Sequence, residues 1–158
     1  MYRVSEARWI DLPSNRDSRG VLTSIESNIN IPFTIKRIFY MHHIITDRGG
    51  HAHIDTDQVI VATAGSFKID LCDGEITKTY EMNNATKGLY VPRMVFMKLY
   101  NFSKSTVCLV LANTHYEISK SINQLEEQMY KYANQTEFEK AAYCRDKIKE
   151  LKRKLIEV

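Results

Sequence analysis

The sequence predicts a mainly β protein that ends in a pair of α-helices. Between residues 58 and 113, short runs of β-forming residues recur, and turn residues separate them at close intervals. Many short strands at this spacing are typical of a sandwich or a barrel. After about Ser119, glycine and proline are absent and helix-forming residues take over, which predicts the helices.

The first 50 residues contain less regular strand signals. The expected elements are, in order, a strand at 9–12, a turn at SNRDSRG, a strand at VLTSIE, a break at NINIPF, a long strand at TIKRIFYMHHI and a loop at TDRGG. In the long strand, Arg37 and Phe39 share one face, whereas Ile38 and Tyr40 share the other.

The next segment, 48–65, carries two histidines that flank one alanine. Residues two apart on a strand project from the same face, so we expect the imidazoles of His51 and His53 to point the same way. Gln58 and Ile60 follow with even spacing. Such a pair suits metal binding or proton transfer near neutral pH, and the third alternative is two surface histidines without a role.

A hairpin turn and three further strand signals follow the histidine strand. Asp73-Gly74 predicts a two-residue hairpin turn of type I′, in which both central residues have positive φ. GLYVP and VFMKLYNF follow, and VCLVLA is typical of a strand buried on both faces.

The last 40 residues predict two antiparallel helices with a short connection. Leu125, Met129 and Tyr132 form an apolar stripe on the first helix. Thr136 and Glu139 fit a capping box at the start of the second helix. We therefore divide the chain into a β domain, residues 1–118, and a helical hairpin, residues 119–158.

Composition excludes several classes of protein. The net charge of +3 over 158 residues is too small to indicate nucleic-acid binding. No apolar run approaches the roughly 18 residues of a membrane span, and the N-terminus lacks a signal-peptide core. Cys72, Cys108 and Cys144 are widely spaced and odd in number, so we expect reduced thiols in a cytoplasmic protein.

The histidine segment resembles the first motif of the cupins, His-x-His-x4-Gln58-x6-Gly65, and Gly88-x3-Pro92-x4-Met97-x3-Asn101 resembles the second. Metal-binding cupins carry a glutamate where Gln58 stands and a histidine where Met97 stands. A neutral amide and a thioether are poor ligands for the cations of such sites. We therefore expect no metal, and acid–base chemistry by the histidines.

Residues 4–117 resemble one group of metal-free cupins, the sugar 3,4-ketoisomerases of the FdtA/QdtA group. The segments that carry the resemblance are SRGVLTSIE, IPFTIKRIFY, RGGHAH, QVIVATAGSFKIDLCDG, GLYVP and NFSKSTVCLVLA. The resemblance implies a cupin double-stranded β-helix (jelly roll) without a cofactor, and a homodimer or higher homo-oligomer. It also implies conversion of dTDP-4-keto-6-deoxy-D-glucose to a dTDP-3-keto-6-deoxyhexose, for 3-amino-3,6-dideoxy sugars of lipopolysaccharides or S-layer glycans.

The resemblance and the chemistry together suggest roles for seven residues. We expect His51 to be the main acid/base, His53 its partner, and Tyr40 a proton donor or oxyanion stabiliser. Tyr40 is proposed because position 39 is Phe where relatives carry an aromatic hydroxyl. The substrate-binding candidates are Arg48, Arg19 and Arg37 for the diphosphate and Gln58 for a sugar hydroxyl.

The helical segment resembles a different family, the UVR motif of nucleotide-excision-repair subunits. Leu125-x3-Met129 and the run from Thr136 through FEKAA and Arg145-Asp146 to Leu151 carry the resemblance. In that family the motif pairs with another copy or with a partner protein, so we expect residues 119–158 to be an association module.

Two alternatives remain open at this point. A cupin without metal ligands could be a non-catalytic ligand-binding or adaptor protein, with the helical hairpin recruiting a partner. Within the enzymes, a related nucleotide-sugar epimerase has a similar fold.

Overall fold

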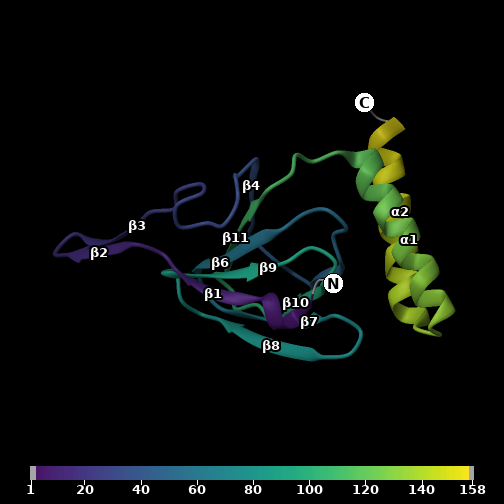
Figure 1. Cartoon of the computed structure of the whole chain (residues 1–158), viewed down its shortest axis with the longest axis horizontal. Helices are drawn as coiled ribbons and strands as arrows, with labels where there is room; N and C mark the ends of the chain where they lie inside the picture. Colours follow the sequence, from purple (N-terminus) through teal and green to yellow (C-terminus); the bar gives the residue numbers. More distant parts are fainter. Residues whose placement is uncertain (1–2, 157–158) are drawn as a thin grey trace.

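Two β-sheets face each other, and two α-helices pack at one end of them (Figure 1). The computed structural model describes residues 3–156, so the first two residues of the expected β domain and the last two of the helical hairpin lie outside it. The prediction of a mainly β jelly roll followed by a helical hairpin is confirmed.

All neighbouring strands within the two sheets are antiparallel. The five-stranded sheet has the order β1 (Arg8–Asp11), β9 (Lys87–Val91), β6 (Gln58–Ala64), β11 (Val107–Ala112) and β4 (Arg37–Met41). The four-stranded sheet has the order β5 (Arg48–His51), β10 (Phe96–Tyr100), β7 (Phe67–Cys72) and β8 (Thr77–Met82). A short 3₁₀ helix, Val4–Glu6, precedes β1.

The main core fills the space between the two sheets. Alternate residues of facing strands supply it, among them Ile60, Ile69, Leu89 and Val110. A second apolar layer lies on the outer face of the five-stranded sheet, where the chain between β3 and β4 covers it. Strands β6 and β11 are therefore buried on both faces, as the apolar run VCLVLA predicts for β11.

A two-stranded hairpin, β2 (Ser14–Asp17) with β3 (Gly20–Thr23), projects from the sheets at the end opposite the helices (Figure 1). The prediction of a turn for SNRD was wrong, because these four residues form β2. All four are exposed, so burial imposed no apolar alternation that the sequence could reveal. Val21 and Leu22 are also exposed, Leu22 to 68%.

One other strand and one turn were predicted at the right place but with the wrong length. The long strand expected at 34–44 is only β4, which ends at Met41. The turn at Asp73-Gly74 spans four residues between β7 and β8, because the Asp73 carboxylate accepts hydrogen bonds from the backbone N–H groups of Glu75 and Ile76.

The helices α1 (Ile118–Asn134) and α2 (Phe138–Ile156) form the expected antiparallel hairpin (Figure 1). They pack through a small core that contains Leu125, Tyr132 and Ile148. Thr136 does not cap α2, because its φ is +60° and its hydroxyl donates to the Gln135 carbonyl. Neither helix, within the residues described, has the length and apolar character needed to cross a bilayer.

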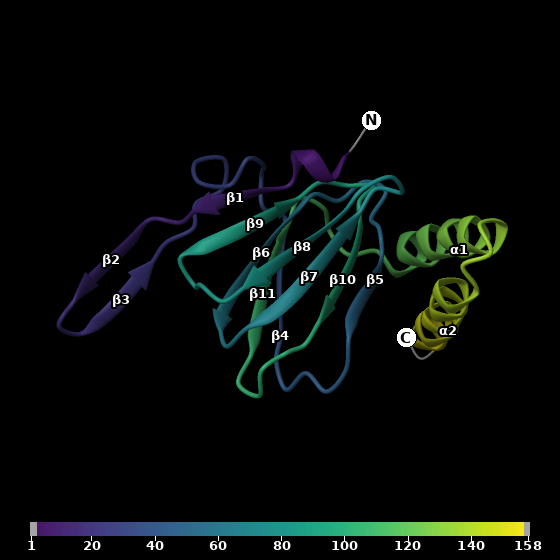
Figure 2. The same cartoon turned by 90° about the horizontal axis from the view of Figure 1, so that it is seen from below.

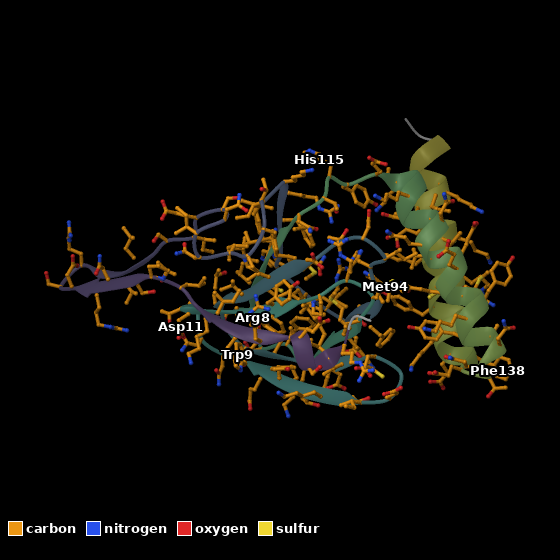
Figure 3. The ribbon with its side chains drawn as sticks, viewed as in Figure 1. Arg8, Trp9, Asp11, Met94, His115 and Phe138 are labelled. Atoms are coloured by element: carbon orange, nitrogen blue, oxygen red, sulfur yellow. The ribbon has the colours of Figure 1, made fainter. Side chains whose placement is uncertain are left out.

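The hairpin packs against the β domain, with β5 as the strand of its sheet nearest the helices (Figure 2). Polar contacts come from α1: the Gln128 amide donates to the Ala52 carbonyl, and Lys120 and Gln124 both bind the Asp55 carboxylate. Met94 lies on the side of the sheets that faces the helices, whereas Phe138 lies at the outer end of the hairpin (Figure 3).

Candidate active site

A cavity of about 470 Å³ opens between the two sheets at the end that faces α2. Strands β4, β5, β6, β10 and β11 supply most of its wall, and the rest comes from α2 and from the segments that follow β5 and β11, which contribute His53 and Tyr116. Five of the seven residues predicted from the sequence line this cavity. They are His51, His53, Arg37, Arg48 and Gln58.

The two histidine rings meet edge to face inside the cavity. His51 ends β5 and His53 follows two residues later, and their Nε2 atoms are 3.1 Å apart. The Nδ1 atom of His51 lies 3.2 Å from the Gly49 carbonyl oxygen. Because a carbonyl oxygen only accepts, the neutral His51 ring carries its hydrogen on Nδ1, and its Nε2 accepts a hydrogen bond from Nε2–H of His53.

Burial keeps both rings uncharged at neutral pH. It lowers the pKa of His51, and the positive charges of Lys147 and Arg48 lower it further, against the hydrogen bond to Gly49. Burial, with His51 and Arg37 nearby, lowers the pKa of His53 to about 3. A neutral imidazole can accept a proton, so the pair is ready for general base chemistry over the physiological range.

Two guanidinium groups flank the histidines. Arg37 on β4 stacks between two aromatic rings, with its Cζ 5.0 Å from the ring centre of Phe39 and 5.2 Å from that of Tyr116. Its buried Nε has no hydrogen-bond partner among the described residues, and burial lowers its pKa. Arg48 is exposed at the start of β5, with Nε 3.3 Å from the Met41 sulfur. A buried guanidinium donor without a protein partner is available to a ligand.

The electrostatics of the cavity favour an anion. None of the described side chains that line it is an Asp or Glu, whereas Arg37, Arg48 and Lys147 bring three positive charges. Gln58 and Met97 are both buried in the wall, at the positions where metal-binding cupins carry two further ligands. Over residues 3–156 no group of three or more His, Cys, Asp or Glu side chains is arranged to hold a metal ion.

Two predicted site residues do not lie with the histidines. Tyr40 is 63% exposed and stacks on His42, because strand alternation turns it away from Arg37 and Phe39. Arg19 lies at the tip of the β2–β3 hairpin, where its exposed guanidinium pairs with Asp17 at 2.6 Å. Neither residue lines the cavity of its own chain.

Sequence reasoning missed four residues that line the cavity. Phe39 was on the correct face by alternation, but its lack of a hydroxyl drew attention to Tyr40. Tyr116 follows the last strand, where no periodic signal fixes an orientation. Tyr143 and Lys147 are four residues apart on α2, a spacing that places them on one face, but nothing in the sequence shows that this face meets the β domain.

Two family models match the chain. FdtA, described as WxcM-like, C-terminal, matches residues 5–135. The UvrB/uvrC motif (UVR) matches residues 119–154, the segment that forms the helical hairpin.

Similar proteins support the first of these two matches. The TDP-4-oxo-6-deoxy-alpha-D-glucose-3,4-oxoisomerase of Aneurinibacillus thermoaerophilus is 38% identical over 123 residues, which cover 77% of this chain and 88% of that protein. A mutant of the 3,4-ketoisomerase QdtA from Thermoanaerobacterium thermosaccharolyticum, solved with TDP-4-keto-6-deoxyglucose, superposes with a TM-score of 0.70 at 33% identity, covering 73% of this chain and 85% of that one.

The rmlC epimerase of Mycobacterium tuberculosis shares only the fold, with a TM-score of 0.61 at 14% identity. The match covers 74% of this chain and 68% of the epimerase.

Proposed function

Because the chain belongs to the FdtA (WxcM-like, C-terminal) family, we propose that it isomerises a TDP-linked 4-keto-6-deoxyhexose to the 3-keto isomer. The observation that carries the proposal is the pair of neutral histidines inside a cavity with three positive charges. The histidines suit proton transfer, and the charges suit a nucleoside diphosphate.

The isomerisation needs one base, one acid and a group that stabilises an oxyanion. The base removes the hydrogen on carbon 3, and an enediolate forms across carbons 3 and 4. A proton then returns to carbon 4, while the hydrogen of the carbon-3 hydroxyl passes to the oxygen on carbon 4. No electrons leave the sugar, so the reaction requires no redox cofactor.

We assign the base to His51. Its hydrogen on Nδ1 is held by the Gly49 carbonyl, so Nε2 is its basic nitrogen, and this atom takes the substrate proton once the hydrogen bond from His53 opens. His53, whose Nε2 contacts His51 at 3.1 Å, is the partner that relays the proton. Tyr40 faces away, so the phenol that we assign to the oxyanion is Tyr116, which lines the same cavity.

The remaining predicted residues fit substrate binding. Arg37 and Arg48 would bind the diphosphate, and the buried amide of Gln58 would bind a sugar hydroxyl. Arg19 lies on a projecting hairpin, so it would reach a sugar only in the cavity of a second copy. That arrangement fits a homodimer, which we propose as the assembly. We also propose that the protein is cytoplasmic and that it acts in the synthesis of 3-amino-3,6-dideoxy sugars.

The test is incubation of the protein with TDP-4-keto-6-deoxyglucose and EDTA, followed by NMR. We expect a 3-keto product with EDTA present. His51→Asn and His53→Asn should lower turnover by about 10²–10⁴, the range for a positioned acid or base. Tyr40→Phe is the matched control and should keep wild-type turnover, because the ring faces outward.

Three outcomes would contradict the proposal. Full activity in both histidine variants would rule out acid–base catalysis by His51 and His53. Inversion of a carbon centre without carbonyl migration would identify an epimerase. Tight binding of the sugar without any turnover would identify a ligand-binding or adaptor protein.

A further inference from the structure

The helical hairpin forms part of the wall of the catalytic cavity. Tyr143 and Lys147 of α2 both line it, together with His51 at the end of β5, His53 in the segment that follows, and Arg37 of β4. They lie one helical turn apart, so a single face of α2 meets the cavity.

The fit between the hairpin and the histidine strand is close at Gly50. A Cβ atom at position 50 would lie 2.9 Å from Cε1 of Tyr143, so the ring occupies the space that a side chain there would need. Gly50 also has φ of +80°, which an L-residue rarely adopts. The strand is therefore shaped to receive the Tyr143 ring.

The other helix holds the hairpin in this position. Lys120 and Gln124 of α1 bind Asp55, two residues after His53, and Gln128 donates to the carbonyl of Ala52, which lies between the histidines. The rings of Phe96 on β10 and Tyr132 on α1 meet edge to face, with centres 5.8 Å apart. These contacts all involve the histidine segment or the strand next to β5.

Lys147 brings an ammonium group to the cavity from a half-buried position. Its Nζ pairs with Glu150 at 2.7 Å, and Glu150 also pairs with Lys154 at 3.1 Å. Lys147 can therefore turn to an anion without leaving Glu150 unpaired. Its charge is close enough to His51 to lower the pKa of that ring.

We infer that Lys147 of the UVR-like hairpin binds the diphosphate of the nucleotide sugar, so that the hairpin is a built-in part of the active site. The inference rests on the proposed function for the class of substrate. Tyr143 lines the wall beside Lys147.

The test compares Lys147→Met, Lys147→Arg and Lys149→Met with the wild-type protein, using calorimetric titration with TDP and steady-state kinetics on the 4-keto sugar. Lys147→Met should weaken TDP binding about tenfold and raise KM about tenfold, with kcat changed less than about twofold, because one charge-assisted contact is lost. Lys147→Arg keeps the charge and should restore most of the affinity. Lys149 is exposed and does not line the cavity, so its variant should match the wild type.

Thermal unfolding of each variant separates a binding role from a structural one. Unchanged affinity for TDP in Lys147→Met would overturn the inference while leaving the proposed function intact. A lowered Tm with no recovery of affinity in Lys147→Arg would also overturn it. If the wild-type protein neither bound TDP nor converted the sugar, the proposed function would fail, and the inference would fail with it.

Discussion

At the scale of single residues, no carboxylate among residues 3–156 accepts a hydrogen bond that orients His51 or His53, as one often does for a catalytic imidazole. A backbone carbonyl and the second ring orient them instead, and burial sets their charge state. Burial lowers the pKa of His53 by more than the Asp55 carboxylate raises it. Both rings are therefore neutral over a wide range of pH.

Burial of His53 makes stability depend on pH. Its pKa is about 3 in the folded protein, against about 6.5 in the unfolded chain, so the unfolded chain binds more protons between these values. Its contribution is complete above about pH 6.5 and is lost as the pH falls toward 3. We expect the free energy of unfolding to drop by about 2 kcal/mol from this group between pH 7.5 and pH 5.

Urea unfolding of the wild type and His53→Asn at the two pH values measures this contribution. The variant cannot take up the proton, so its stability should fall by about 2 kcal/mol less over the same interval. Equal pH dependence in the two proteins would mean that the pKa of His53 is the same in the folded and unfolded states.

Arg37 should bind substrate through its planar shape as well as its charge. Arg37→Lys keeps the charge but loses the stacking between Phe39 and Tyr116 and the unpaired Nε donor, so KM should rise about tenfold with little change in kcat. Arg8→Lys is the control, because Arg8 lies 4.5 Å from the ring centre of Tyr90 and does not line the cavity. A similar KM in all three proteins would contradict a binding role for Arg37.

The sequence predicted site residues best where strand periodicity applies. Arg37 lies on the face that strand alternation assigns to it and lines the cavity with His51 and His53. The expected strand does not extend to His53, because β5 ends at His51. Tyr40 was chosen for its hydroxyl against the alternation that places it on the outer face. Lys147 reaches the cavity only through tertiary packing, which no local pattern encodes.

At the scale of elements, the contact between β5 and α2 should depend on glycine at position 50, because it has no side chain. Gly50→Ala adds a methyl group 2.9 Å from the Tyr143 ring to a residue with positive φ, so it should destabilise the fold by about 1–3 kcal/mol and weaken TDP binding. Gly74 has φ of +98° and no atom within 4 Å of its ideal Cβ, so Gly74→Ala carries only the backbone strain.

Chemical denaturation of both alanine variants separates the two effects. The loss of stability should be larger for Gly50→Ala than for Gly74→Ala, and only the former should bind TDP more weakly. Equal losses, with unchanged TDP binding, would show that the helix does not press on the histidine strand.

Elements were predicted accurately where apolar patterns are dense. Strands β6 and β11 are buried on both faces, and their continuous apolar runs mark them clearly. Strand β2 is wholly exposed and was missed, since no burial constrains its side chains. The Asp73 turn was longer than expected because a side-chain carboxylate replaces backbone partners in it.

At the scale of the whole molecule, we expect the projecting β2–β3 hairpin to pack against a second copy of the chain. An isolated two-stranded hairpin is marginal in water, and Val21 and Leu22 expose apolar surface on this one. We expect a homodimer by light scattering, and Leu22→Lys should shift it to monomers and lower turnover. Ile76→Lys, at an exposed residue in the turn between β7 and β8, should remain dimeric. A monomeric wild type would contradict this expectation.

The order of a β domain and a helical hairpin could be predicted, because strand-like alternation in the first part of the sequence gives way to helical apolar stripes in the second. The sequence did not predict how the helical hairpin packs on the β domain, because burial within each part already accounts for most of its apolar residues. The contacts that join them include polar side chains that bind Asp55 and the Ala52 carbonyl, the edge-to-face rings of Phe96 and Tyr132, and the Tyr143 ring against Gly50.

The position of α2 beside β5 also has a consequence for solubility. Strand β5 is the last strand of its sheet, and its outer side would otherwise offer unpaired backbone groups to a strand from another molecule. The helix covers that side near Gly50, whereas the opposite margin, β8, carries the exposed charges of Lys78 and Glu81. Both margins of the sheet are thus guarded against intermolecular strand addition, one by a helix and the other by charge.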